Sequence, residues 1–196
     1  MLYYLINQYK ACMSKSALNQ KTKIHFGPSG RAVSQEIDND LLDNILQHLT
    51  MERNANVQYF SMSLWFQERE LNGFSSFFLK ESKDELEHAQ KFTDYLIARG
   101  QSVDLNALSK PVQEWESIQD LIAYSFNMEA DLTISLQQLY AISERTSDIR
   151  TNVFLDPIVE SQIKSEDEFA NILGKVKFSG ENPAAMLIVD DYLSRK

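Results

Sequence analysis

The stretch Lys83-Asp-Glu-Leu-Glu-His-Ala-Gln90 determines how the chain is expected to fold. Glu85 and His88 stand three residues apart, so on a helix their side chains point the same way. Apolar residues extend this face on both sides at steps of three or four, the period of an amphipathic helix. The face comprises Phe74, Phe78, Glu81, Glu85, His88, Phe92 and Leu96. A carboxylate and an imidazole are therefore predicted on the buried side of a helix.

Burial of these charged groups is unfavourable unless another group compensates for it, and a divalent metal ion is one such compensator. Glu-x-x-His is also a spacing with which four-helix bundles bind pairs of metal ions. By itself the motif is weak, because the same spacing occurs by chance on solvent-exposed helices. Matching ligands on other helices would favour the metal site.

Composition indicates one all-α domain. The chain has 196 residues, is 43% hydrophobic and 24% charged, and contains only 6 Gly and 4 Pro. Few helix breakers and long periodic runs favour helices, and the length suffices for a sizeable core. No apolar run approaches the roughly 18 residues of a membrane helix, so no membrane association is expected. The single cysteine, Cys12, excludes an internal disulfide and suits a reducing compartment such as the cytoplasm.

Charge is unevenly distributed along the chain. Residues 1–35 contain basic but no acidic residues, so all 28 acids lie in residues 36–196. An acidic body repels nucleic acid and attracts cations, although solubility alone also explains it. Residues 1–35 are predicted to be a flexible N-terminal arm, because they lack a helical pattern and contain Gly27-Pro28-Ser29-Gly30. The arm is either a transit segment, which would indicate a plastid protein, or partly an upstream start before Met13.

Residues 36–196 are predicted to form a four-helix bundle with a short fifth helix. The connection over residues 101–116 is long enough to cross the bundle rather than form a hairpin. The fourth helix has two alternatives: Asp156-Pro157 begins it, or Pro157 lies inside a helix that began near Ser147. The other helices are expected over residues 39–68, 73–99, 117–143 and 184–193.

Each long helix carries a ligand-type polar residue near the middle of its apolar stripe. These residues are Glu52, the Glu85/His88 pair, Glu129 and Gln162. No Lys or Arg lies on the four stripes, so buried carboxylates there need cations or protons. Oxygen ligands with one imidazole suit iron or manganese.

With these residues in place, residues 36–194 resemble a non-haem ferritin of the cyanobacterial or algal kind, a ferritin-like di-iron protein. The resemblance rests on motifs in the same order and at similar spacing. They are Met51-Glu-Arg, Tyr59, Trp65, Glu85-Leu-Glu-His88, Asp94-Tyr-Leu, Met128-Glu129 and Gln162.

The resemblance implies an iron-binding role for each of these positions. Glu52, Glu85 and His88 would hold the first iron, with Glu85 bridging to a second iron at Glu129, and Gln162 would lie nearby. Tyr59 would bond near the centre and supply an electron, so Tyr59 and Glu85 are the predicted catalytic residues.

Further acids would serve iron transit or pores: Glu81, Asp84, Asp156, Glu160 and Glu166, although an ordinary solvated face also explains them. Two departures from the family pattern stand on the fourth helix. Glu160-Ser-Gln-Ile163 lacks the histidine of haem-containing relatives, which indicates a weaker second site and no haem. Ser161 replaces a glutamate, and Lys164 and Ser165 disfavour a third iron site.

The implied function is iron storage and detoxification. The protein would bind two irons per subunit, oxidise Fe²⁺ with O₂ as a ferroxidase, and mineralise Fe³⁺ inside a homo-oligomeric shell of twenty-four subunits. One alternative is an oxidase or peroxidase on the same bundle that stores no iron. Another is a metal-free helical interaction protein.

Overall fold

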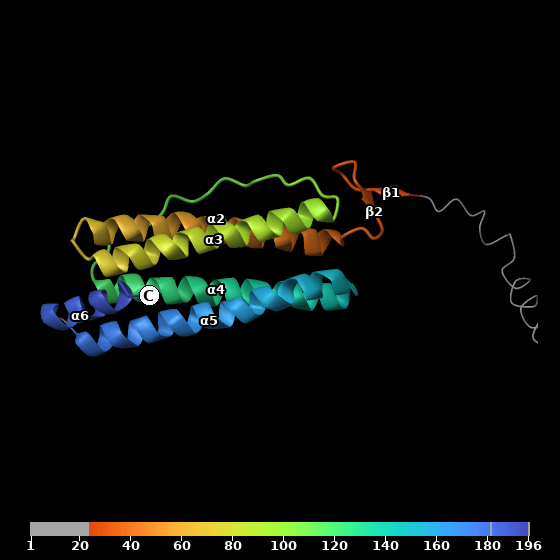
Figure 1. Ribbon diagram of the computed structural model, residues 1–196. Helices are drawn as coiled ribbons and strands as arrows, with labels where there is room; N and C mark the ends of the chain where they lie inside the picture. Colours follow the sequence, from red (N-terminus) through yellow and green to blue (C-terminus); the bar gives the residue numbers. More distant parts are fainter. Residues whose placement is uncertain (1–23, 181, 196) are drawn as a thin grey trace, which may run out of the picture.

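The computed structural model describes residues 24–180 and 182–195. Four long helices form the bundle in Figure 1, and a short fifth helix lies at one end. Helix α2 pairs closely with α3, α4 pairs with α5, and α2 packs against α4. The helices are α2 (Asn39–Gln67), α3 (Asn72–Ala98), α4 (Ile118–Arg145), α5 (Ile149–Ser179) and α6 (Pro183–Leu193). The predicted all-α class and bundle architecture are confirmed.

Side-chain caps fix where the helices begin. The Asp38 carboxylate accepts hydrogen bonds from the first backbone N–H groups of α2, and Asn182 does the same for α6. Helix α5 begins at Ile149, with Asp148 as its cap, and Pro157 lies inside it. The alternative in which Asp156 caps this helix and Pro157 begins it was therefore wrong, because the chain is already helical from Ile149.

The connection between α3 and α4 runs along the outside of α2, which confirms the predicted crossover (Figure 1). The Gln58 side chain holds it through both backbone groups of Val112, donating to the carbonyl at 3.0 Å and accepting from the N–H at 2.8 Å. Arg53 donates to the Asn106 carbonyl at 2.9 Å. These bonds replace the backbone partners that an extended segment lacks.

The core consists of two hydrophobic clusters with polar residues between them. One cluster is rich in aromatic side chains, including Phe66, Phe78 and Phe169. The other is mainly aliphatic and includes Ile45 and Leu139. On α2, α3 and α5, the ligand-type residue lies in sequence between members of the two clusters, and on α4 Glu129 lies just before Leu132, the last residue of the first cluster on that helix. The fold thus places four polar positions at one level of the bundle, with apolar layers on both sides.

A small hairpin precedes the bundle and was not predicted. Strand β1 (His25–Phe26) pairs antiparallel with β2 (Ala32–Val33). The hairpin rests on the turn after α3, where the Ser29 backbone N–H and hydroxyl both donate to the Gly100 carbonyl. A Cβ atom on Gly27 would lie 2.3 Å from that same oxygen, so this close approach requires glycine.

Residues 24–35 of the predicted flexible arm are therefore held against the bundle. The earlier part of the arm, with Cys12 and Met13, lies outside the described residues. Across residues 24–180 and 182–195, the helices include no segment both long and apolar enough to cross a membrane.

A buried ion pair joins the end of α3 to the start of α5. The Arg99 guanidinium donates to both carboxylate oxygens of Asp148, at 2.7 and 3.0 Å, and both side chains are buried. Burial raises the pKa of Asp148, but its bonds to Arg99 outweigh this effect and hold that pKa below its ordinary value. The pair stabilises the fold where α5 begins.

Removing the Asp148 carboxylate should therefore destabilise the protein strongly. Loss of one partner from a buried pair costs about 3–5 kcal/mol, so Asp148→Ala should lower Tm by roughly 6–20 °C. Since the folded-state pKa is depressed, the stabilisation is present above the unfolded-state pKa of about 4 and is lost as pH falls through the folded-state value. Calorimetric melting of the metal-free protein between pH 7 and pH 3 measures both effects.

Lys164→Ala is the matched control, because Lys164 belongs to an exposed pair with Glu160. Such pairs contribute about 0–1 kcal/mol, so its Tm should hardly change. Equal Tm losses in the two variants would contradict the structural role of Asp148.

Candidate metal centre

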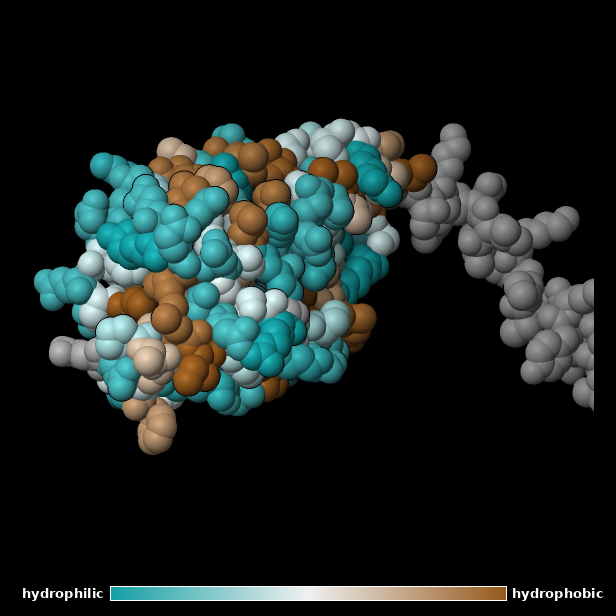
Figure 2. All heavy atoms as spheres, turned by 60° about the vertical axis from the view of Figure 1, so that its left-hand side comes forward, coloured by the Kyte–Doolittle hydropathy of each residue, from teal (hydrophilic) through white to brown (hydrophobic). Residues whose placement is uncertain are grey.

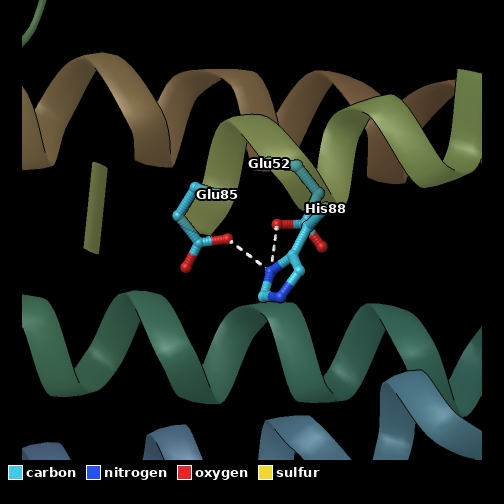
Figure 3. A group of neighbouring side chains, drawn as sticks. All are labelled: Glu52, Glu85 and His88. Atoms are coloured by element: carbon cyan, nitrogen blue, oxygen red, sulfur yellow. Dashed lines mark hydrogen bonds and ion pairs between the residues drawn. The ribbon is translucent and has the colours of Figure 1, made fainter. Parts of the chain in front are cut away.

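Three predicted ligands meet in the middle of the bundle. Glu52 comes from α2, and Glu85 and His88 come from α3, where their i,i+3 spacing places both on the inward face (Figure 3). One possible ligand atom from each residue lies within 4.8 Å of those of the other two. His88 Nδ1 is 3.0 Å from Glu85 Oε2 and 3.8 Å from Glu52 Oε2. This spacing allows one cation to contact all three side chains.

The two oxygens of Glu52 have different surroundings. Oε1 lies 2.9 Å from Nε2 of His48, which is one helical turn earlier. Oε2 is buried and has no hydrogen-bond partner. An unpartnered buried carboxylate oxygen is unfavourable, and a metal ion would satisfy it.

The electrostatics of the three ligands reflect their crowding. Burial and the neighbouring charge of Glu52 raise the pKa of Glu85 well above its ordinary value. Burial alone would also raise the pKa of Glu52, but contacts with His48 and His88 outweigh it and lower that pKa. Burial would lower the pKa of His88, yet Glu52 and Glu85 raise it to about 10. Without metal, protons therefore neutralise part of the cluster.

Glu129, Tyr59 and Gln162 form a second group beside the first. The Tyr59 hydroxyl donates a short hydrogen bond to Glu129 Oε1, and the Gln162 amide donates to Oε2 at 2.8 Å. Burial raises the pKa of Glu129, and burial with the Glu129 charge raises that of Tyr59. Both Glu129 oxygens are thus already engaged, unlike Oε2 of Glu52. A metal that binds Glu129 must compete with these donors.

Sequence reasoning missed His48, which is fully buried beside Glu52. Its Nδ1 lies 2.9 Å from the hydroxyl of Ser135 on α4. On this helix Glu52 alone was predicted as a ligand-type residue. The signal was available, because Ile45, His48 and Glu52 follow steps of three and four.

A family model for the ferritin-like domain matches residues 42–179. The chain belongs to the ferritin family. It is 29% identical to a bacterial non-heme ferritin from Campylobacter jejuni over 147 residues, covering 75% of this chain and 88% of that protein. A ferritin from Pacifastacus leniusculus is 28% identical over 156 residues, which cover 78% of this chain and 86% of that one. The predicted membership in the non-haem ferritins is confirmed.

Solved structures show the same relationship. An open pore ferritin from Archaeoglobus fulgidus superposes with a TM-score of 0.79 and 28% identity, covering 82% of this chain and 98% of that one. A humanized archaeal ferritin gives a TM-score of 0.80 at 27% identity, with the same coverage. The bundle described above is a ferritin fold.

The donor set of this ferritin fits iron. Glu52 and Glu85 offer hard carboxylate oxygens and His88 offers one imidazole, a combination that suits iron in preference to softer metals. The unpartnered Oε2 of Glu52 is an open ligand position. The fit is best at these three residues, because Glu129 already accepts two hydrogen bonds.

The predicted transit and pore residues of the ferritin lie in varied surroundings. Glu81 is buried one turn before Glu85, and burial together with Glu168 and Asp84 raises its pKa to about 8 despite nearby Lys80. Asp84 is partly exposed and lies 3.9 Å from the Lys80 amine. Glu81 thus adjoins the centre, whereas Asp84 reaches solvent.

The remaining three acids lie on α5. Asp156 is exposed and accepts a hydrogen bond from the Tyr140 hydroxyl at 2.7 Å, and exposed Glu160 pairs with Lys164 at 3.1 Å. Glu166 is partly buried and accepts a short hydrogen bond from Thr133 on α4. Their roles in pores or transit stay predictions.

Metal binding by this ferritin should release protons. Because the pKa of His88 is about 10, its imidazole is protonated at neutral pH and must lose a proton to bind a metal. The apparent affinity for Co²⁺ should rise by about tenfold per pH unit for each proton displaced, from pH 6 to pH 8. Anaerobic calorimetry in buffers with different ionisation enthalpies counts these protons. A pH-independent affinity without proton release would contradict the assignment of His88.

Proposed function

We propose that this ferritin stores iron and oxidises Fe²⁺ with O₂ at the centre formed by Glu52, Glu85, His88 and Glu129. The observation that carries the proposal is the buried, unpartnered Oε2 of Glu52, which lies beside Glu85 and His88. In this proposal iron is the substrate and the cargo. Membership in the ferritin family and similarity to non-heme ferritins support storage as the outcome.

The arrangement suits binding of two Fe²⁺ ions in sequence. Glu52, Glu85 and His88 take the first ion, since they offer a free buried oxygen. Glu85 also faces Glu129, whose charge contributes to the raised pKa of Glu85. Glu85 can therefore bridge to a second ion at Glu129, where the metal replaces the Gln162 amide on Oε2 and the Tyr59 hydroxyl keeps its bond to Oε1. Two adjacent Fe²⁺ ions can together deliver two electrons to O₂.

Tyr59 is suited to deliver a further electron to the partly reduced O₂, and a later Fe²⁺ ion can restore the phenol by giving it one electron as the proton returns. The Tyr59 hydroxyl is buried and bonded to Glu129, and its raised pKa keeps the phenol protonated at neutral pH. The phenol can lose an electron while its proton moves along the existing hydrogen bond to the carboxylate. Glu81 and Asp84 then provide carboxylates through which Fe³⁺ leaves for the interior.

We further propose that copies of the chain assemble into a hollow shell of twenty-four subunits. Large apolar side chains remain exposed on the single chain, as Figure 2 shows for the end carrying α6. Phe178 is 96% exposed, and Leu187 and Ile188 are also exposed. Such surfaces mark protein interfaces. In the shell, Asp156 and Glu160 would line acidic entry pores.

Iron loading tests storage directly. The protein is given excess Fe²⁺ in air and separated by size-exclusion chromatography, and iron per subunit is measured in the protein peak. Storage requires a shell-sized peak whose iron content greatly exceeds the capacity of the centre. A small oligomer that holds no more iron than its centres would instead indicate an oxidase or peroxidase without storage.

The Glu85→Ala variant tests whether Fe²⁺ oxidation takes place at the proposed centre. Loss of the bridging carboxylate should reduce the initial rate of Fe²⁺ oxidation to near the background rate in buffer, as followed by stopped-flow absorbance. Glu87→Ala is the matched control, because Glu87 is exposed two residues away on the same helix. Equal rates in the two variants would refute the proposed centre.

Tyr59→Phe separates iron binding from electron supply. It removes the hydroxyl that bonds Glu129 and leaves the packing of the ring, so anaerobic Fe²⁺ binding at the first site should persist. Oxidation over several turnovers should slow several-fold, because no phenol supplies the additional electron. Tyr124→Phe, at a partly exposed tyrosine of α4, is the control. Unchanged multi-turnover kinetics in Tyr59→Phe would exclude this role.

A further inference from the structure

His48 is a buried imidazole adjacent to the metal centre but separate from its ligands. It lies one helical turn before Glu52 on α2 and is 0% exposed. Its ring nitrogens do not belong to the cluster of ligand atoms formed by Glu52, Glu85 and His88. Among the three ligands, the ring contacts Glu52.

Two neighbouring helices fix the orientation of the His48 ring. Ser135 on α4 places its hydroxyl 2.9 Å from Nδ1. Phe92 on α3 meets the ring edge to face, with 4.6 Å between the ring centres. If the Ser135 hydroxyl donates to Nδ1, the ring proton of a neutral imidazole resides on Nε2. Nε2 then faces Glu52 as a donor.

The contact with Glu52 distinguishes its two oxygens. Nε2 lies 2.9 Å from Oε1, close but without the alignment of a hydrogen bond. Oε2 lies toward His88 and has no hydrogen-bond partner. His48 thus lies against one oxygen of Glu52, and the other oxygen faces the remaining ligands of the centre. Ligating carboxylates are commonly fixed in this way by hydrogen bonds behind them.

We propose that His48 is a positioning residue that holds Glu52 for metal binding through Oε2 alone. When a metal binds Oε2, Nε2–H of His48 donates to Oε1, which keeps the carboxylate from rotating or binding through both oxygens. The inference rests on the proposed function of Glu52 as a ligand. Its consequence is a higher affinity of the first site, because Glu52 is oriented before the metal arrives.

Three variants of the full-length protein test this role. His48→Leu removes the donor but fills the space with a buried apolar side chain, and His48→Gln retains an amide N–H at similar reach. Gln47→Leu is the matched control, because the neighbouring Gln47 is exposed. Melting without metal shows that each variant is folded, and anaerobic Co²⁺ titration followed by absorbance and calorimetry gives affinity and coordination.

His48→Leu should weaken Co²⁺ binding at the first site by about 10–100-fold, the effect typical of losing a hydrogen bond behind a ligand. His48→Gln should restore most of the affinity with the absorption spectrum of the unsubstituted protein, and Gln47→Leu should change neither. An unchanged affinity in His48→Leu would overturn the inference, and so would an equal loss in His48→Gln. If the unsubstituted protein fails to bind Co²⁺, the metal centre itself is refuted.

Discussion

Repulsion among buried carboxylates is the constraint on which the middle of this bundle depends. Glu52, Glu85 and Glu129 are each at most 3% exposed, and no lysine or arginine lies on the four inward stripes to neutralise them. Without metal, the charge is spread over protons and hydrogen bonds: His88 and Glu85 have raised pKa values, and Tyr59 donates to Glu129. A cation bound among these side chains would neutralise the same charges.

The apolar layers on either side make this constraint strong. Aromatic side chains pack between the centre and the α6 end, and aliphatic ones pack toward the hairpin end. Because both layers exclude water, each polar contact at the centre is stronger than it would be in solvent. Outside the centre, the Arg99–Asp148 pair joins the end of α3 to the start of α5, and the Gln58–Val112 bonds join α2 to the connection before α4.

The two parts of the centre, at Glu52 and at Glu129, differ in how many hydrogen bonds their carboxylates already accept. Glu52 presents one free oxygen, whereas both oxygens of Glu129 already accept hydrogen bonds. The absence of a histidine after Gln162 had predicted a weaker second half. The weaker second half stays a prediction; the structure shows two hydrogen-bond donors on Glu129 with which a metal there would have to compete. The local sequence shows which ligand residues of the family pattern are missing. Only the packed structure shows which of the remaining ligands already accept hydrogen bonds.

Periodicity and spacing were sufficient for the bundle, the crossover and the inward positions of Glu52, Glu85, His88, Glu129 and Gln162. Those features depend on residues a few positions apart on one helix, where the helical repeat alone sets direction. The contacts of His48 with Ser135 and of Arg99 with Asp148 join residues that are 87 and 49 positions apart. The hydrogen bond from Ser29 to Gly100 likewise joins two residues that are 71 positions apart in the sequence. Such pairs depend on how the helices turn and slide against one another, which packing decides and no local pattern encodes.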